Sequence, residues 1–195
     1  MNQTAMTGIV VCGGKSSRMG TDKSMLRYYD EPQRYHIAKL LQPFCTDVYI
    51  SLNNNQEEVH EYKIIRDNAT FDNLGPMTGL LSAYDALPDK NFLFIGCDYP
   101  LLTAEELSLF VQSINQTTKA SAFFNKAENL YEPLLAYYPS GFGQELKDYF
   151  LQGNNSLQKL LFRSAAERYI PMNKDAFRSV DNQVDFEEVM AIIRK

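Results

Sequence analysis

Short apolar runs recur along the chain, and turn-forming residues stop them. The first, TGIVVC at residues 7–12, is continuous and ends at Gly13 and Gly14, which is typical of a strand buried on both faces. NFLFIGCD at residues 91–98 is the clearest strand, because it is apolar nearly throughout and closes on Asp98. The full pattern predicts strands at residues 7–12, 47–52, 62–67, 91–98, 119–125 and 131–138.

Between these runs the apolar residues follow the spacing of helices. Segment 32–44 has a proline near each end, and segment 103–114 begins with Thr103 followed by Glu106, which is typical of a capping box. The pattern predicts helices at residues 32–44, 75–87, 103–114, 141–150, 156–168 and 185–195. Strands that alternate with helices indicate an α/β fold, a three-layer Rossmann-like sandwich with a mainly parallel central sheet and helices on both faces. No repeat or linker divides the sequence, so we expect one domain over residues 1–195.

Composition narrows the classes of function. The chain has 195 residues and a net charge of −5, which argues against a broad nucleic-acid-binding face. The first residues lack the pattern of a signal peptide, and no apolar run reaches the roughly 20 residues of a membrane-spanning helix. The three cysteines are widely spaced and fit neither a disulfide framework nor a zinc site. We therefore expect a cytoplasmic protein with no membrane or nucleic-acid partner.

Ligands of open α/β sheets sit outside the carboxyl ends of the strands. One segment there, GGKSSRMGTDK at residues 13–23, combines a glycine turn with the cations Lys15, Arg18 and Lys23. Gly13 and Gly14 allow backbone N–H groups to approach a ligand closely. The Walker A and GxGxxG spacings are both absent. Composition alone therefore leaves two interpretations, an anion-binding loop or a solvated basic turn.

Other strand ends carry candidate ligands as well. Asp98 ends the clearest strand, where a carboxylate could bind a divalent cation or serve as a turn residue before Pro100. The only two histidines, His36 and His60, lie away from the strand ends, so the cysteines lack a candidate base for nucleophilic catalysis. A reaction whose nucleophile is already an anion, such as a phosphate, would need no such base.

Several motifs together resemble the molybdenum cofactor guanylyltransferases, which are nucleotidyltransferases of the glycosyltransferase-A type. VCGGKSSRMGTDK at residues 11–23 resembles their LAGGxSxRMGxDK signature, and DNATFDNLGPMTGLLSA at 67–83 is similar to their D…GPLAGxxSA segment. CDYP at 97–100 looks like their CDxP metal motif, and YEPLLAYYP at 131–139 resembles their PLxALYP strand. The likeness runs through most of the chain in the right order, which is more specific than any one motif.

The resemblance implies substrates and roles. GTP would be bound over the strand ends, and molybdenum-loaded molybdopterin would attack its α-phosphorus to form molybdopterin guanine dinucleotide and pyrophosphate. Molybdenum-insertion proteins and molybdoenzyme chaperones are the implied protein partners. The implied nucleotide-binding residues are Val11, Cys12, Gly13, Gly14, Lys23, Asn53, Asp67 and Asp98. The implied catalytic residues are Arg18, Lys23 and Asp98, with Asp98 binding Mg²⁺.

One segment departs from the family pattern. The family carries an NxNTPxD sequence near its carboxyl end, where this chain reads SVDNQVDF at residues 179–186 and retains Asp185. Asp181 stands at the second asparagine, where it could be a second metal ligand or a residue that leads into the helix.

Three alternative functions stay open: a cytidylyltransferase acting on molybdopterin, an enzyme that activates a sugar or polyol phosphate, and a non-catalytic nucleotide-binding or partner protein. The VCGG sequence stands where many of these alternative relatives carry AAG, and on family grounds it favours guanine as the base.

Overall fold

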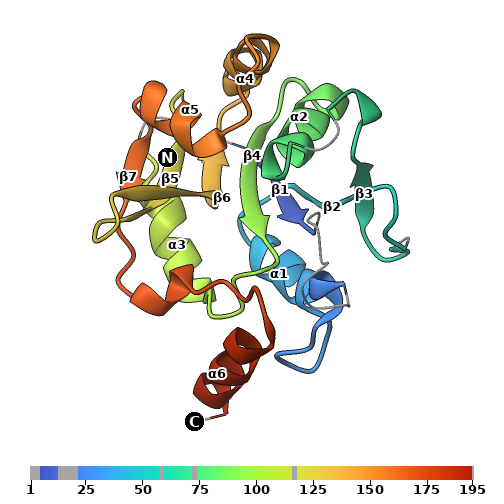
Figure 1. Ribbon diagram of the computed structural model, residues 1–195, viewed down its shortest axis with the longest axis vertical. Helices are drawn as coiled ribbons and strands as arrows, with labels where there is room; N and C mark the ends of the chain where they lie inside the picture. Colours follow the sequence, from blue (N-terminus) through green and yellow to red (C-terminus); the bar gives the residue numbers. More distant parts are fainter. Residues whose placement is uncertain (1–4, 13–21, 58, 72–73, 116–117, 195) are drawn as a thin grey trace.

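In the computed structural model a seven-stranded sheet crosses the molecule in the order β3-β2-β1-β4-β6-β5-β7 (Figure 1). The structure describes residues 5–12, 22–57, 59–71, 74–115 and 118–194. The strands are β1 (Met6–Val11), β2 (Asp47–Leu52), β3 (Lys63–Arg66), β4 (Asn91–Gly96), β5 (Ser121–Asn125), β6 (Leu130–Tyr138) and β7 (Glu167–Tyr169). Only β6 runs antiparallel to its neighbours in this sheet, which confirms the predicted α/β class with a mainly parallel sheet.

Helices cover both faces of the sheet, as predicted. They are α1 (Gln33–Leu41), α2 (Pro76–Ala86), α3 (Ala104–Ser113), α4 (Phe142–Leu151), α5 (Leu157–Arg163) and α6 (Gln183–Ile193). Along β1, Val10 faces the cluster that contains α1 and α3, whereas Ile9 faces the cluster that contains α2, α4 and α5. This alternation places one helical layer on each face. No helix in the described part of the chain has the length and apolar character needed to cross a membrane.

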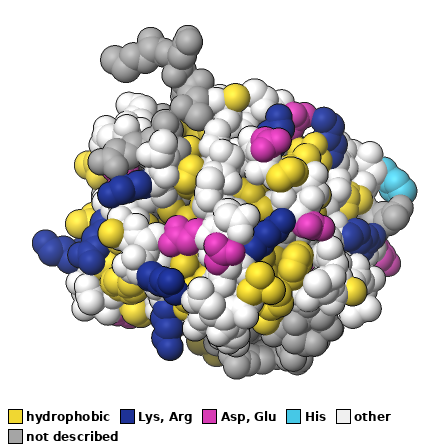
Figure 2. Space-filling model, turned by 90° about the horizontal axis from the view of Figure 1, so that it is seen from above, with side chains coloured by type: hydrophobic (Ala, Val, Ile, Leu, Met, Phe, Trp, Pro, Cys, Tyr) yellow, Lys and Arg dark blue, Asp and Glu magenta, His cyan; other side chains and the backbone are white. Residues whose placement is uncertain are grey.

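The end of the molecule that carries α4 has a mixed surface. Figure 2 views this end and shows Lys and Arg side chains interspersed with Asp and Glu side chains, with apolar side chains between them. Charges of both signs at short intervals cancel one another at a distance. The described part of this face therefore presents no single-sign field to a partner.

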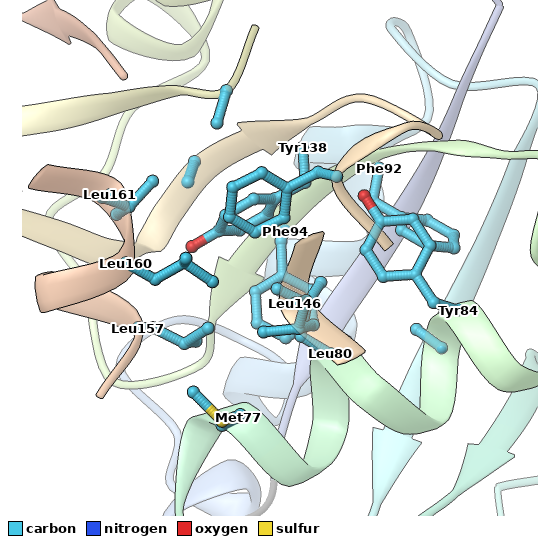
Figure 3. Close-up of a cluster of buried hydrophobic side chains, with 14 of the residues drawn as sticks. Met77, Leu80, Tyr84, Phe92, Phe94, Tyr138, Leu146, Leu157, Leu160 and Leu161 are labelled. Atoms are coloured by element: carbon cyan, nitrogen blue, oxygen red, sulfur yellow. The ribbon is translucent and has the colours of Figure 1, made fainter. Parts of the chain in front are cut away.

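The larger of the two cores fixes β4 against α2. Figure 3 shows Leu80 and Tyr84 of α2 directed at the aromatic rings of β4 and β6. The Tyr84 and Phe92 ring centroids are 4.7 Å apart, and the Tyr84 hydroxyl donates to the Pro139 carbonyl at 2.7 Å. Burying each such ring or leucine contributes about 1.5–3 kcal/mol. The central strand is thus held firmly at the position where its carboxyl end carries Asp98.

A third, smaller cluster joins α6 to the strand ends. It contains Tyr28, Leu101, Val180 and Val189, and Phe186 packs against it. Figure 1 shows α6 apart from both helical layers, at the end of the molecule where the C terminus lies. This cluster brings the C-terminal segment into contact with the loop that follows β4.

One predicted element is wrong. The sequence predicts a single helix over residues 156–168, but α5 ends at Arg163 and residues Glu167–Tyr169 form β7 beside β5. The chain reverses at Ala165, whose φ is +48°, and the Ala166 N–H then bonds to the Leu161 carbonyl at 3.0 Å. This left-handed C-terminal cap is usually built with glycine. The sequence SAA therefore gives no signal that the helix stops.

The capping box predicted for α3 forms only in part. The Thr103 side chain does accept from the Glu106 N–H at 3.1 Å. The Glu106 carboxylate does not return to Thr103, however. It accepts from the Tyr169 hydroxyl at 2.5 Å and from the Met172 and Asn173 N–H groups at 3.1 and 3.0 Å. One buried carboxylate thereby fastens the segment after β7 to α3.

Glu106→Ala should destabilise the fold by about 2–4 kcal/mol, because it leaves two backbone N–H groups and a hydroxyl without their acceptor. Urea denaturation followed by circular dichroism measures this loss. Glu105→Ala, at the exposed neighbouring position, is the control and should change stability by less than about 1 kcal/mol. Equal effects of the two substitutions would contradict the role assigned to Glu106.

Candidate active site

The ends of four parallel strands meet at one edge of the sheet. Cys12 follows β1 and its N–H donates to the Ser51 carbonyl at 3.0 Å, while the Cys97 N–H donates to the Val11 carbonyl at 3.0 Å. The Asp67 N–H donates to the Leu52 carbonyl at 3.0 Å. These bonds continue the ladder one residue beyond the strands. The candidate residues at all four strand ends therefore share a single edge.

Two residues that the sequence did not single out brace this edge. The Gln56 side chain donates to the Cys12 carbonyl at 3.1 Å and to the Asp22 carboxylate at 2.8 Å, and it accepts from the Asn53 N–H at 3.0 Å. The Arg66 guanidinium donates to the carbonyls of Asn53 and Gln56 at 2.9 and 2.8 Å. Gln56 thus connects the end of β1, the turn after β2 and the end of the basic loop. In the sequence, the one signal for Gln56 is its position in the polar stretch that follows the strand at residues 47–52.

Asn53 and Asp67 occupy neighbouring strand ends. The Asn53 side-chain oxygen accepts from the Asn55 N–H at 2.9 Å, which leaves its NH₂ group available as a donor. The Asn54 side chain donates to the Asp67 carbonyl at 3.2 Å and so joins the turn to the end of β3. Both candidates are half-buried, at the edge where a nucleoside could lie.

Asp98 is the most unusual group at this edge. Its Oδ1 atom is shielded from solvent and has no hydrogen-bond partner among the described residues. Burial raises the pKa of this carboxyl to about 6, nearby Asp181 also acts to raise it, and Lys23 opposes the change. A Cβ on Gly96 would lie only 2.4 Å from Oδ1, so the absence of a side chain there lets the carboxylate fold back over the strand end.

Lys23 and Asp181 face one another across this edge. Their Nζ and Oδ1 atoms are 2.8 Å apart, although 158 positions separate the two residues. Asp22 caps the short 3₁₀ helix Lys23–Met25 by accepting from the Ser24 N–H at 2.9 Å. This cap fixes the backbone that carries Lys23. The Val180 N–H donates to the Asp98 carbonyl at 3.0 Å and holds the C-terminal segment against the same strand end. A cation and two carboxylates from three distant segments thus gather in one place.

Asp185 has a structural role. Its carboxylate accepts from the N–H groups of Asp181 and Asn182, and the Asn182 side chain accepts from the Asp185 N–H at 3.1 Å. This reciprocal pattern is a capping box at the start of α6. The residue retained from the family pattern therefore orients the backbone that carries Asp181.

Two of the three cysteines, Cys12 and Cys97, are buried, and Cys45 is partly buried. Cys12 and Cys97 follow adjacent strands and are nearly inaccessible to solvent. Contact with the Cys12 thiol and burial both raise the pKa of Cys97, which keeps it protonated and unreactive. His36 lies in α1 with its ring stacked on Tyr29, and burial lowers its pKa. Gly13, Gly14, Lys15 and Arg18 lie outside the described residues, so their contacts stay predictions.

The donor set suits a hard divalent cation. The shielded Asp98 oxygen is an unpaired anionic ligand of the type that Mg²⁺ prefers, and Mg²⁺ commonly takes only one or two protein carboxylates beside phosphate oxygens. The described residues contain no group of three His, Cys, Asp or Glu side chains that would form an all-protein metal site. Asp98 together with a phosphorylated ligand therefore suits a Mg²⁺ ion better than a metal held entirely by protein side chains.

Asp98→Asn should stabilise the metal-free protein by about 3 kcal/mol near pH 8, because a pKa raised to about 6 penalises the ionised carboxylate of the folded state by that amount. The raised pKa means that folding favours the protonated form. The penalty therefore develops as the pH rises from about 4 to 6, and the advantage of the variant should shrink near pH 4.5. Urea denaturation in EDTA at both pH values measures it, and a variant no more stable than the wild type at pH 8 would contradict the burial of this group.

The chain is similar to known proteins along most of its length. Residues 8–168 match the family described as MobA-like NTP transferase domain. A "Molybdenum cofactor guanylyltransferase" of Campylobacter jejuni is 26% identical over 195 residues, which cover 100% of both chains. A "Molybdenum cofactor biosynthesis bifunctional protein" of Synechocystis is 29% identical over 141 residues, or 71% of this chain and 40% of that longer protein.

The fold has a solved counterpart. The crystal structure of "Molybdopterin-guanine dinucleotide biosynthesis protein A" from Archaeoglobus fulgidus superposes with a TM-score of 0.78, covering 97% of this chain and 99% of that one at 19% identity. A likeness at this identity establishes the fold, while the sequence match covers every strand end that forms the edge. The chain therefore belongs to the MobA-like NTP transferase domain family.

Proposed function

We propose that this protein transfers GMP from GTP to the terminal phosphate of molybdenum-loaded molybdopterin. The products are molybdopterin guanine dinucleotide and pyrophosphate. The carrying observation is the gathering of Lys23, Asp98 and Asp181 at the carboxyl edge of the sheet. The full-length match to a protein named as a guanylyltransferase supports guanine as the base.

The chemistry needs charge and position rather than a base. A phosphate oxygen of the acceptor forms a bond to the α-phosphorus of GTP, and the bond from that phosphorus to the β-phosphate oxygen breaks to release pyrophosphate. Because the attacking oxygen is already anionic, no proton has to be removed. Lys23 and Arg18 would offset the repulsion between two anionic substrates.

Asp98 would hold Mg²⁺ in this reaction. When bound, the cation neutralises phosphate charge and supports the leaving pyrophosphate. The shielded oxygen of Asp98 gains a partner on metal binding, which relieves the cost of keeping it desolvated. Asp181 pairs with Lys23 and would release that lysine to the phosphates.

The nucleoside would lie over β1, β2 and β3. Val11, Cys12, Gly13 and Gly14 would supply backbone groups near the base and ribose, and Asn53 and Asp67 would fix the guanosine. Gln56 and Arg66 support this assignment because they lock the backbone at these strand ends. Molybdenum-insertion proteins and molybdoenzyme chaperones are the protein partners that we propose with this activity.

The affinity for GTP in the presence of Mg²⁺ should exceed the affinities for CTP and ATP at least tenfold. Asp98→Asn should reduce the rate of pyrophosphate release at least a hundredfold, as expected for loss of a metal ligand. Calorimetry gives the nucleotide preference, and a coupled pyrophosphate assay with loaded molybdopterin gives the rate. Asp89→Asn removes an exposed carboxylate in the turn before β4 and is the matched control. Equal affinity for the three nucleotides would overturn the guanylyl assignment.

Asp181→Asn should tighten GTP binding in EDTA by up to about fivefold, because a half-exposed ion pair of about 1 kcal/mol no longer competes for Lys23. Calorimetric titration with GTP measures the change. Asp175→Asn removes the same charge from the same C-terminal region without touching Lys23 and should leave binding unaltered. Weaker binding by Asp181→Asn in EDTA would exclude competition between Asp181 and the phosphates.

A further inference from the structure

The Gln56 side chain connects the two parts of the site that a nucleoside triphosphate would occupy. Its Oε1 atom accepts from the Asn53 N–H at 3.0 Å, on the side of the strand ends. Its Nε2 atom donates to the Cys12 carbonyl at 3.1 Å and to Oδ2 of Asp22 at 2.8 Å. A glutamine amide has two N–H donors, and both are used here.

These three partners allow the Gln56 amide only one orientation. A reversed amide would place its NH₂ group against the Asn53 N–H, donor against donor. It would also place its oxygen against the Cys12 carbonyl and the Asp22 carboxylate, acceptor against acceptor. The side chain therefore holds its three partners at set positions relative to one another.

The turn after β2 gives Gln56 a braced starting point. The Gln56 N–H donates to the Asn53 carbonyl at 3.3 Å, and the Arg66 guanidinium donates to the carbonyls of both residues at 2.9 and 2.8 Å. The Asn54 side chain joins the same turn to the Asp67 carbonyl at 3.2 Å. The backbone of the turn is thus tied to the end of β3, on the nucleoside side of the site.

Asp22 carries the connection onward to Lys23. Each oxygen of its carboxylate has a separate partner: Oδ2 accepts from Gln56, and Oδ1 accepts from the Ser24 N–H at 2.9 Å. The second bond caps the 3₁₀ helix Lys23–Met25, whose first residue is Lys23 itself. One carboxylate therefore joins the helix that presents the candidate phosphate-binding lysine to the turn after β2.

Charge alone does not account for a carboxylate at this position. Asp22 immediately precedes Lys23, so its negative charge lies near the place where the phosphates would bind. A like charge close to a bound anion weakens binding by repulsion. The benefit of Asp22 must therefore come from the two hydrogen bonds that fix its geometry.

We propose that Gln56 is a positioning residue for the nucleotide, an inference that rests on the proposed function. Acting through Asp22, it holds the helix of Lys23 at a set place relative to the strand ends that would bind the nucleoside. A nucleotide whose nucleoside lies beside Asn53 then finds Lys23 already placed for its phosphates. Such preorganisation raises affinity because less ordering is required on binding. The contribution of the triphosphate to affinity thus depends on the bond between Gln56 and Asp22.

The ratio of the affinity for GTP to the affinity for guanosine isolates that contribution, because guanosine has no phosphates. Equilibrium dialysis of each ligand in the presence of Mg²⁺ measures the ratio. Asp22→Asn keeps the helix cap, since asparagine and aspartate serve equally well as N-caps, but it presents an NH₂ group to the Gln56 donor. We expect the ratio to fall about fivefold to tenfold, while the affinity for guanosine changes less than about twofold.

An exchange of donor and acceptor tests the bond itself. Gln56→Glu places an anionic oxygen against the Asp22 carboxylate and should lower the ratio at least tenfold. The double variant Asp22→Asn with Gln56→Glu rebuilds the hydrogen bond in the opposite direction and should restore the ratio to within about threefold of the wild type. Gln144→Glu is the matched control, because Gln144 donates to Asp148 at the same distance of 2.8 Å on exposed α4. It should leave the ratio unaltered.

The direction of the Asp22→Asn effect separates positioning from charge. If Asp22 acted only through its charge, its removal would tighten GTP binding, and that result would overturn the proposal. An unchanged ratio, or a double variant no better than Gln56→Glu, would overturn it as well. Should Gln56→Glu fail to fold in thermal melting, Asp22→Asn alone decides. A preference for cytidine over guanosine refutes only the proposed function, and the same ratio is then measured with CTP and cytidine.

Discussion

A carboxylate with one oxygen kept away from water is the constraint around which this site is built. One oxygen of Asp98 is shielded and unpaired among the described residues, and burial raises the pKa of the group to about 6. A desolvated charge is costly, so it persists only where the surrounding structure leaves it no alternative. The aromatic core behind β4, the small residue Gly96 and the bond from Val180 to the Asp98 carbonyl impose that position.

The mixed sheet divides the site into two halves. Parallel strands end together and present backbone and amide groups on the side of β1, β2 and β3. The antiparallel β6 runs past that edge and supplies the apolar wall on the other side. One edge can therefore receive a nucleoside and a second, chemically different substrate on either side of the same carboxylate.

Much of this could be predicted from the sequence, because the strands are apolar runs and their ends are fixed by topology. Asp98 and Lys23 were found in this way, and the parallel ladder accounts for their common edge. The contact between Lys23 and Asp181 could not be predicted, because it spans 158 positions and depends on the packing of α6. Gln56 and Glu106 were missed as braces for a similar reason: their partners are backbone groups that only the folded chain brings near.

The most direct test is a crystal structure with Mn²⁺ and α,β-methylene-GTP, in which anomalous scattering locates the metal. We expect a single strong peak at the Asp98 carboxylate, with the triphosphate beside Lys23 and the guanosine over the ends of β1, β2 and β3. Lys23 should have exchanged Asp181 for a phosphate oxygen. Manganese bound elsewhere, with the Lys23–Asp181 pair intact and Asp98 still unpaired, would contradict the account.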